Sequence, residues 1–301
     1  MSAGLCEGRV CVISGAGRGI GRSHAEALAR EGARVVVNDL GVPTDGGPAS
    51  SDAAREAVEA IVAAGGEAVA NLDDVATMEG ATRLVGQALD TWGRLDVVVN
   101  NAGILRDRTI VAMTEDDWDA VLRVHLKSTF LLTSVAANHW RERTKAGDLP
   151  DARIVNTTSA SGLYGQPGQA NYGAAKAGIA SFTVIAAMEL ARYGVTVNAL
   201  CPTAMTRMME GTRFAESDEA KQGVLDPKYV SPALVWLASP LSAGVTGRVI
   251  GASGRALYVA EGWARGPATG AVDDPHAVDA ALRPLLEAAR ANADMLGNVP
   301  A

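Results

Sequence analysis

The sequence predicts a doubly wound α/β fold, in which a mainly parallel sheet of seven strands carries helices on both faces. Short runs of β-branched residues alternate with Ala-rich segments of helical periodicity, which is the pattern of successive βαβ units. A glycine-rich loop at 13–21 joins the first of these runs to the first helical segment. Of the 301 residues 48% are apolar, which is ample for a large core.

The strands and helices are expected to follow one another in regular order. Runs rich in Val, Ile and Ala predict strands at 9–14, 33–39, 67–71, 94–100, 152–158, 195–200 and 247–252. The segments between them predict helices near 19–31, 51–64, 77–92, 115–142, 171–192 and 230–238. Because a helix separates each strand from the next, we expect a parallel sheet.

Three segments interrupt this alternation. Residues 41–51 are rich in Gly, Pro and Ser, so they predict a loop. Residues 203–228 hold polar turns between a strand and a helix, where a substrate lid is expected. The C-terminal extension 266–301 has helical periodicity, and Pro284 is expected to split its helix or to begin a second one. Residues 1–265 are expected to form one domain.

Composition excludes several classes of function. The net charge of −7 argues against nucleic acid or an anionic membrane as the main partner. No signal peptide and no apolar run near the ~20 residues of a membrane span are found. Three scattered cysteines (Cys6, Cys11 and Cys201) favour a reducing compartment, so we expect a cytoplasmic protein. No metal-ligating residue is singled out.

The glycine-rich loop predicts a dinucleotide site on a Rossmann-type sheet. Gly15, Gly19 and Gly21 stand between a strand and a helix, where they allow a pyrophosphate to approach the backbone and the helix N-terminus. Asp39 ends the second strand and can accept hydrogen bonds from ribose hydroxyls. Its charge would repel a 2′-phosphate, so we expect NAD rather than NADP, although Arg18 within the loop could meet such a phosphate.

A tyrosine and a lysine predict acid–base chemistry. Tyr172 and Lys176 are four residues apart and share one face of a helix. A free phenol has a pKa of ~10, and a nearby ammonium together with the positive nicotinamide is expected to lower that pKa. Ser159 follows the fifth strand, and its hydroxyl could hold the oxygen of a substrate.

These motifs resemble the short-chain dehydrogenase/reductase family over roughly residues 8–262. The resemblance is carried by "SGAGRGIG", "NNAG", Ser159, "YGAAK" and "NALCP". It implies that Tyr172 is the general acid–base, that Ser159 orients the substrate carbonyl and that Lys176 binds the nicotinamide ribose. The cofactor residues that it implies are Gly15, Arg18, Gly19, Ile20, Gly21, Asp39, Asp74, Val75, Asn101, Ala102, Gly103, Tyr172, Lys176 and Pro202.

Longer strings resemble one branch of that family, the (3R)-hydroxyacyl-CoA dehydrogenase modules of peroxisomal multifunctional enzymes. "NNAGILRDRT", "VHLKSTF" and "TSASGLYGQPGQANYGAAKAG" carry this closer likeness. The branch has His125 where most of the family has asparagine as the fourth catalytic residue, whose main-chain carbonyl holds a relay water. Two segments depart from the family pattern: Pro202 precedes Thr203 instead of glycine, and "GASGRA" replaces Asp-Gly-Gly.

The leading hypothesis is therefore an NAD-dependent oxidoreductase that reversibly oxidises a (3R)-3-hydroxyacyl-CoA in lipid or sterol side-chain breakdown. A dehydrogenase of hydroxysteroids or other free alcohols is the alternative, because Met205, Met208 and Met209 suit a plastic apolar pocket. A CoA substrate would instead need basic residues such as Arg106, Arg108 and Arg207. An inactive cofactor-binding regulator is the third hypothesis. The resemblance also implies a homodimer or homotetramer.

Overall fold

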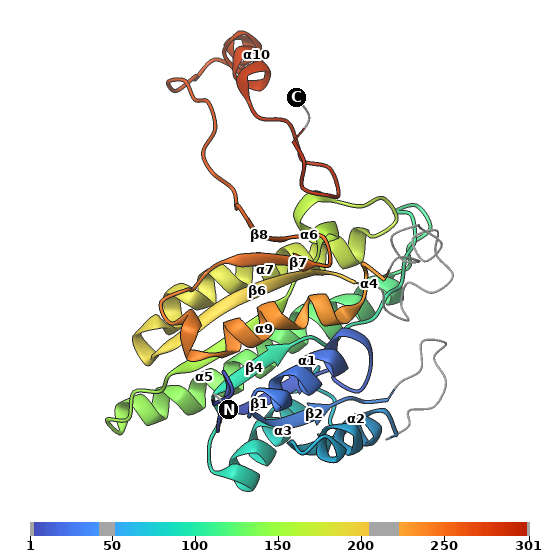
Figure 1. Cartoon of the computed structure of the whole chain (residues 1–301). Coiled ribbons are helices and arrows are strands. Elements are labelled where there is room, and N and C mark those ends of the chain that lie inside the picture. The colour runs from blue at the N-terminus through green and yellow to red at the C-terminus, as the bar shows by residue number, and fades with distance from the viewer. Residues whose placement is uncertain (1–2, 42–51, 205–222, 300–301) are drawn as a thin grey trace.

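The computed structural model describes residues 3–41, 52–204 and 223–299. Its centre is one eight-stranded sheet in the order β3-β2-β1-β4-β5-β6-β7-β8, with helices on both faces (Figure 1). All neighbouring strands are parallel except β7 and β8. The chain crosses from β3 at one edge back to β4 beside β1, so the strand order reverses there and leaves a crevice at the carboxyl ends of both strands.

The seven predicted strands are confirmed, with ends that differ by a few residues. One further strand, β8, was not predicted because its four residues alternate between exposed and half-buried and lie at the edge of the sheet. The strands are β1 (Val10–Ser14), β2 (Arg34–Asn38), β3 (Glu67–Asn71), β4 (Val97–Asn100), β5 (Ala152–Thr157), β6 (Val195–Thr203), β7 (Val249–Ser253) and β8 (Leu257–Ala260).

Two layers of helices bury the two faces of the sheet. Apolar side chains of α1, α2 and α9 form one core with the strands, and those of α3, α5 and α7 form the other. The helices are α1 (Gly19–Arg30), α2 (Asp52–Ala63), α3 (Met78–Trp92), α4 (Glu115–Leu122), α5 (Ser128–Lys145), α6 (Ala160–Tyr164), α7 (Ala170–Leu190), α9 (Ser231–Ala238) and α10 (Val278–Ala288). The prediction of helices on both faces is confirmed.

The predicted single helix at 115–142 is wrong in one respect. A π-helical turn, η1 (Arg123–Lys127), separates α4 from α5. Two hydroxyl side chains hold this turn: Ser128 Oγ donates to the Val124 carbonyl at 2.5 Å, and Thr129 Oγ1 donates to the His125 carbonyl at 2.8 Å. A π turn adds one residue to the helical repeat, and functional sites often contain one. Hydrophobic periodicity did not reveal it.

The C-terminal extension leaves the sheet after β8 and carries α10 away from the rest of the molecule (Figure 1). No residue of α10 is buried. The prediction that Pro284 divides this helix is wrong, since Pro284 lies inside it. A proline removes one main-chain hydrogen bond from a helix, and α10 continues on both sides of that gap.

One helix in the described part of the chain, Ala170–Tyr193, is long and apolar enough to cross a membrane. Helices that cover the core of a water-soluble protein also have this length and composition, so the observation is weak. Here α7 packs on the sheet through buried residues such as Ile179 and Ala187, and it contains Lys176. We therefore interpret it as a covering helix of the sheet.

Candidate active site

Four predicted catalytic residues come together at the carboxyl ends of the central strands. Ser159 follows β5 and caps the N-terminus of α6, where its hydroxyl accepts a hydrogen bond from the main chain of Ser161 at 3.3 Å. Tyr172 and Lys176 lie one turn apart on α7, and His125 lies in η1. The site is therefore assembled from three separate segments of the chain.

The phenol of Tyr172 lies between Ser159 and Lys176. The Ser159 hydroxyl lies close enough to the phenol to lower its pKa as a hydrogen-bond partner, and the Lys176 ammonium lies 5.5 Å from the centroid of the ring. Lys176 is buried, and its Nζ donates to the Thr157 carbonyl at 2.7 Å. The Thr158 hydroxyl donates to the Lys176 carbonyl at 2.8 Å, which fixes α7 against the end of β5.

Burial shifts the pKa values of Tyr172 and Lys176 in the directions that favour the neutral phenol and the neutral amine. It raises the pKa of Tyr172 to about 12, although the Ser159 hydrogen bond opposes this shift. It lowers the pKa of Lys176 to about 7, which a negative charge on Cys201 would oppose. The chain's own groups therefore do not produce the lowering of the tyrosine pKa that was expected from the ammonium and the nicotinamide together, because loss of hydration outweighs the Ser159 contribution.

The His125 imidazole is buried beside Tyr172. The two rings meet edge to face at 5.2 Å between centroids. Nε2 lies 3.0 Å from the Ile104 nitrogen and 2.8 Å from the Ile104 oxygen, and the tautomer decides which of them it pairs with. The ring also fills the space beside Gly103, where a Cβ would lie 2.3 Å from Cε1. Burial and the nearby Lys176 lower the pKa of His125, so its ring is neutral.

The main-chain carbonyl of His125 accepts hydrogen bonds from within its own helix. The Thr129 hydroxyl donates to it at 2.8 Å and the Ser128 hydroxyl at 3.3 Å. The resemblance implies that this carbonyl accepts a hydrogen bond from a relay water. In the structure two hydroxyls already donate to the same oxygen, so a water would have to share it with them. The Nδ1 atom of the ring, by contrast, is buried and has no hydrogen-bond partner among the described residues.

The glycine-rich loop is fixed to the segment that follows β4. Gly15 has φ of +63°, which favours glycine, and a Cβ there would lie 2.7 Å from the Ala102 Cα. The Ser14 hydroxyl accepts from the main-chain nitrogens of Asn101 and Ala102, each at 3.1 Å. The Asn101 amide donates to the Gly15 carbonyl at 2.9 Å. This contact leaves the loop open along its outer side, where Gly19 is exposed at the N-terminus of α1.

Asp39 lies at the end of β2 beside this loop. Its carboxylate accepts from the main-chain nitrogen of Gly17 at 2.9 Å and from that of Gly41 at 2.7 Å. Arg18 is half-buried at the N-cap of α1, and Ile20 packs against the core. A nicotinamide dinucleotide fits this cradle: the exposed Gly19 lets a pyrophosphate approach the N-terminus of α1, and a carboxylate stands where the adenosine ribose would bind.

The other predicted cofactor residues lie around the same edge of the sheet. Asp74 forms an ion pair with Arg123, and its Oδ1 accepts from the Ala76 nitrogen at 2.9 Å. Val75 is buried next to it. Pro202 lies on β6 opposite Ala252 of β7. Arg207, the three methionines, most of the predicted lid (205–222) and most of the predicted loop (42–51) lie outside the described residues.

Sequence reasoning missed Asn171, which holds three segments of the site together. This residue is buried, and its Oδ1 accepts from the Tyr172 nitrogen at 2.8 Å. Its Nδ2 donates to the carbonyls of Arg106 and Asp117, both at 3.0 Å. The only hint in the sequence was that an asparagine directly precedes the tyrosine in "QANYGAAK". Its partners Arg106 and Asp117 are 65 and 54 positions away in the chain.

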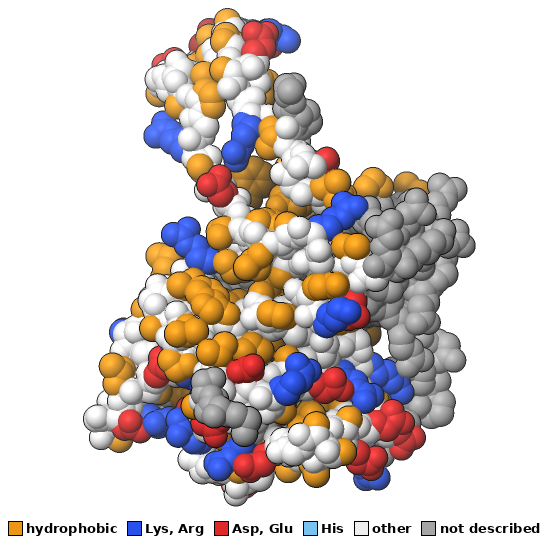
Figure 2. Space-filling view, viewed as in Figure 1, with side chains coloured by type: hydrophobic (Ala, Val, Ile, Leu, Met, Phe, Trp, Pro, Cys, Tyr) orange, Lys and Arg blue, Asp and Glu red, His pale blue; other side chains and the backbone are white. Residues whose placement is uncertain are grey.

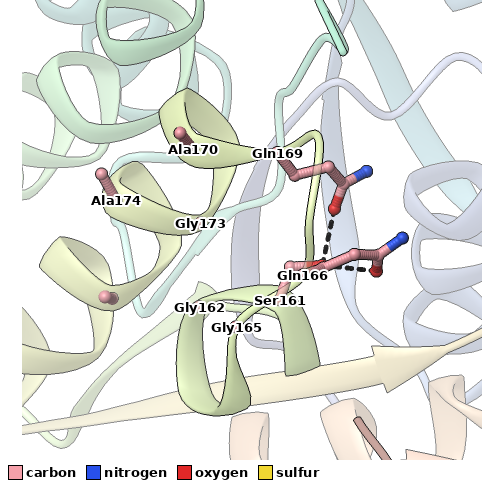
Figure 3. Close-up of a pocket in the computed structure, with 9 residues that line it drawn as sticks. Ser161, Gly162, Gly165, Gln166, Gln169, Ala170, Gly173 and Ala174 are labelled. Atoms are coloured by element: carbon pink, nitrogen blue, oxygen red, sulfur yellow. Dashed lines mark hydrogen bonds between the residues drawn. The ribbon is translucent and has the colours of Figure 1, made fainter. Parts of the chain in front are cut away.

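A cavity of about 320 Å³ lies between α6 and α7, beside the catalytic side chains and not lined by them. The Ser161 hydroxyl donates to Gln169 Oε1 at 2.7 Å and to Gln166 Oε1 at 3.2 Å, and Figure 3 shows both glutamines turned toward this serine. These bonds hold the segment between Ser159 and Tyr172. The remaining lining residues are small: Gly162, Gly165, Ala170, Gly173, Ala174 and Ala177.

Comparison with known proteins agrees with this geometry. A family model described as short chain dehydrogenase matches residues 9–218. The chain is 44% identical over 247 residues to hydroxyacyl-CoA dehydrogenase ChsB1 of Mycobacterium tuberculosis, covering 80% of this chain and 76% of that protein. It is 45% identical over 231 residues to peroxisomal multifunctional enzyme type 2 of Mus musculus, covering 77% of this chain and 30% of that longer protein.

A solved structure supports the same assignment. The crystal structure of a short chain dehydrogenase from Mycobacterium avium is 51% identical and matches with a TM-score of 0.87, covering 96% of this chain and 98% of that one. The resemblance inferred from the sequence motifs is thus confirmed. With the glycine loop, the serine, the tyrosine and the lysine in one site, the chain belongs to the short-chain dehydrogenase/reductase family of oxidoreductases.

Proposed function

We propose that the protein oxidises the secondary alcohol of a (3R)-3-hydroxyacyl-CoA to the 3-oxoacyl-CoA, reversibly and with NAD, in the breakdown of lipids or sterol side chains. The observation that carries the reaction class is the grouping of Ser159, the Tyr172 phenol and the buried Lys176, whose ammonium lies 5.5 Å from the centroid of the phenol ring. The substrate class is supported by the names of the relatives, among them hydroxyacyl-CoA dehydrogenase ChsB1.

The chemistry assigns one task to each side chain. When bound, a nicotinamide ring supplies the acceptor for the hydride that leaves the carbinol carbon. Tyr172 takes the hydroxyl proton, and Ser159 holds the same oxygen by a hydrogen bond. Lys176 holds the cofactor ribose and stabilises the phenolate. Because burial alone raises the pKa of Tyr172 to about 12, the phenolate depends on the positive charges of the complete site.

The test of the substrate class is a panel of alcohols with NAD, followed as NADH at 340 nm. We expect turnover of 3-hydroxyacyl-CoA thioesters, with basic residues such as the exposed Arg106 and Arg108 close to the site. Turnover of free steroids or terpenols without any thioester would establish the alternative alcohol dehydrogenase instead. The third hypothesis, an inactive regulator, is disfavoured because two similar proteins are named dehydrogenases and the site of this chain contains the serine, the tyrosine and the lysine.

We expect the charge of Asp39 to determine the preference for NAD over NADP. Asp39→Asn removes the charge and keeps one of the two acceptor oxygens. The variant therefore loses the hydrogen bond from either Gly17 or Gly41, while the Ser14 and Asn101 contacts still hold the loop. The ratio of kcat/KM with NADP to kcat/KM with NAD should rise at least ~10-fold in this variant. The reason is that the repulsion of ~1–2 kcal/mol between the Asp39 carboxylate and the 2′-phosphate disappears. Measurement of kcat/KM with both cofactors checks this.

The matched control for that experiment is Asp90→Asn on the exposed side of α3, which removes the same charge far from the glycine loop. It should leave the ratio of NAD to NADP use unchanged. An Asp39→Asn enzyme with the wild-type ratio, or a wild-type enzyme that prefers NADP, would contradict the role given to Asp39.

His125→Asn should keep activity within about a hundredfold, ~2.7 kcal/mol of barrier, because an amide can still pair with the main chain of Ile104. His125→Ala should lose more, since it leaves that main chain unpaired and a hollow beside Tyr172. Steady-state kcat/KM of both variants provides the comparison. A larger loss in His125→Asn would show that the imidazole itself takes part.

A homodimer or homotetramer is supported by two exposed apolar faces. One lies on α5 and α7 and includes Phe130, Ile185 and Met188. The other is visible in Figure 2 where hydrophobic side chains gather over α9 and β8, and Leu257 and Val259 belong to it. Faces of this kind mark contacts between subunits. Light scattering after size-exclusion chromatography measures the number of subunits.

We also propose a cytoplasmic location, and cell fractionation tests it.

A further inference from the structure

A group of phenol and thiol side chains lies next to the catalytic residues. Tyr258 of β8 pairs with Gly251 of β7, where a Cβ would lie 2.1 Å from the tyrosine ring. The "GASGRA" segment, which departs from the family pattern, thus makes room for this ring. The Tyr258 hydroxyl lies near the side chains of Tyr164 and Cys201, and the three groups shift one another's pKa values.

This group connects the catalytic residues to the C-terminal extension. Cys201 is buried, and a charge on it would act on both Tyr172 and Lys176. Tyr164 ends α6, the short helix that begins directly after Ser159. The two phenols therefore lie between the reacting groups and the part of the extension that returns to the body (Figure 1).

The returning part of the extension is a preformed turn at 294–298. The Asp294 carboxylate accepts from the main-chain nitrogens of Leu296 at 2.8 Å and Asn298 at 2.9 Å, and the Asp294 nitrogen donates to the Asn298 carbonyl at 2.8 Å. Gly297 in this turn lies against Tyr164, where a Cβ would be 2.9 Å from the hydroxyl and 3.1 Å from Cζ. The turn is thus seated on Tyr164.

The turn brings apolar side chains to this place. Leu296 within the turn is 69% exposed, and Val299, which directly follows the turn, is 39% exposed. An exposed leucine on this hydrogen-bonded turn can bury apolar surface only against another group, and burial of roughly half its side chain corresponds to about a tenfold gain in affinity. A bound molecule with an apolar chain is such a group.

We propose that the turn at 294–298 determines specificity by forming an apolar wall for the acyl chain of the substrate. The inference rests on the proposed function, because the chain is that of a 3-hydroxyacyl-CoA. A short acyl group ends before the turn, whereas a long or branched one contacts Leu296 and Val299. The extension is in this way part of the substrate site, although α10 itself stays away from it (Figure 1).

The test compares Asp294→Ala, which opens the turn, with Asp279→Ala, which removes an equally exposed carboxylate from α10 and its Arg283 ion pair. The full chain is assayed with (3R)-3-hydroxybutyryl-CoA and (3R)-3-hydroxyhexadecanoyl-CoA. In Asp294→Ala the ratio of kcat/KM for the long substrate to that for the short one should fall about tenfold, through KM of the long substrate. Asp279→Ala should keep the wild-type ratio.

Hydrogen exchange of the peptide 290–299 tests the docking separately. Tyr164→Ala should speed this exchange, while Tyr164→Phe, which keeps the ring, should not. The inference is overturned if Asp294→Ala behaves as Asp279→Ala does, or if exchange in Tyr164→Ala equals that of the wild type. If the wild type oxidises only free alcohols, the proposed function fails, and short and long free alcohols then test the turn in the same way.

Discussion

Tyr172→Phe is expected to lower kcat by about 10³-fold, which corresponds to ~4 kcal/mol of barrier, while leaving NAD binding intact. In the proposed reaction the Tyr172 phenolate accepts the proton next to Ser159, and the substitution removes only its oxygen. The ring itself packs against His125 at 5.2 Å and beside the Lys176 ammonium at 5.5 Å, so phenylalanine keeps these contacts. The folded site should remain in place without its acid–base group.

Stopped-flow assays give kcat, and quenching of protein fluorescence by NADH gives the dissociation constant. Tyr193→Phe is the matched control, because it makes the same substitution in the turn after α7, where the ring contacts Arg192 and no catalytic residue. Activity and NAD binding that both persist unchanged in Tyr172→Phe would refute the tyrosine mechanism.

Lys176→Met is expected to abolish most of the activity and, in addition, to make the protein without cofactor relatively more stable at low pH. A lysine whose pKa falls to about 7 on burial is charged in the unfolded chain and largely neutral in the folded one over pH 7 to 10.5. The unfolded chain therefore binds more protons in this window, and stability rises with pH. Below pH 7 both states are charged, and the folded protein bears the full cost of the buried ammonium.

Methionine has a similar length and no charge, so Lys176→Met removes the free-energy cost of burying the ammonium. The difference in unfolding free energy between Lys176→Met and wild type should be larger at pH 6 than at pH 9 by roughly 2–3 kcal/mol. The lost hydrogen bond to the Thr157 carbonyl lowers stability equally at both values and cancels from the comparison. Because Tyr172 titrates only above pH 10, it does not contribute at pH 9 or below.

Denaturant unfolding at the two pH values measures this difference. Lys145→Met is a suitable control, since Lys145 is exposed on α5 and pairs with Glu142. Its effect on stability should change little between pH 6 and pH 9. A Lys176→Met difference that is flat with pH would show that the ammonium stays charged in the folded protein.

Most of the sheet could be predicted from the sequence because the central parallel strands are buried on both faces and read as apolar runs. The run at 97–100, for example, is fully buried between the two helix layers. β8 was missed although its sequence LYVA is apolar, because it has only four residues and lies at the edge of the sheet. The π turn was missed because it depends on hydroxyl groups of Ser128 and Thr129, and apolar spacing does not register them.

The parts of the candidate site that could be predicted are those in which the spacing of residues along one helix fixes their positions. Tyr172 and Lys176 lie one helical turn apart, so their spacing alone places them together. Asn171 acts across the chain on Arg106 and Asp117, and no spacing rule connects residues that distant. The direction of the Tyr172 pKa shift was also beyond the sequence, because it depends on how much water the folded chain excludes.

The contact between Ser14 and Asn101 has a consequence for the energetics of ligand binding. Two main-chain nitrogens and one amide join the glycine loop to the end of β4 before any ligand arrives. A loop that is already ordered loses little conformational entropy on association, so more of the contact energy is available as affinity. The nucleotide half of the ligand should therefore bind with little change in the mobility of this loop, and relaxation measurements of its main-chain amides should differ only slightly between free and bound protein.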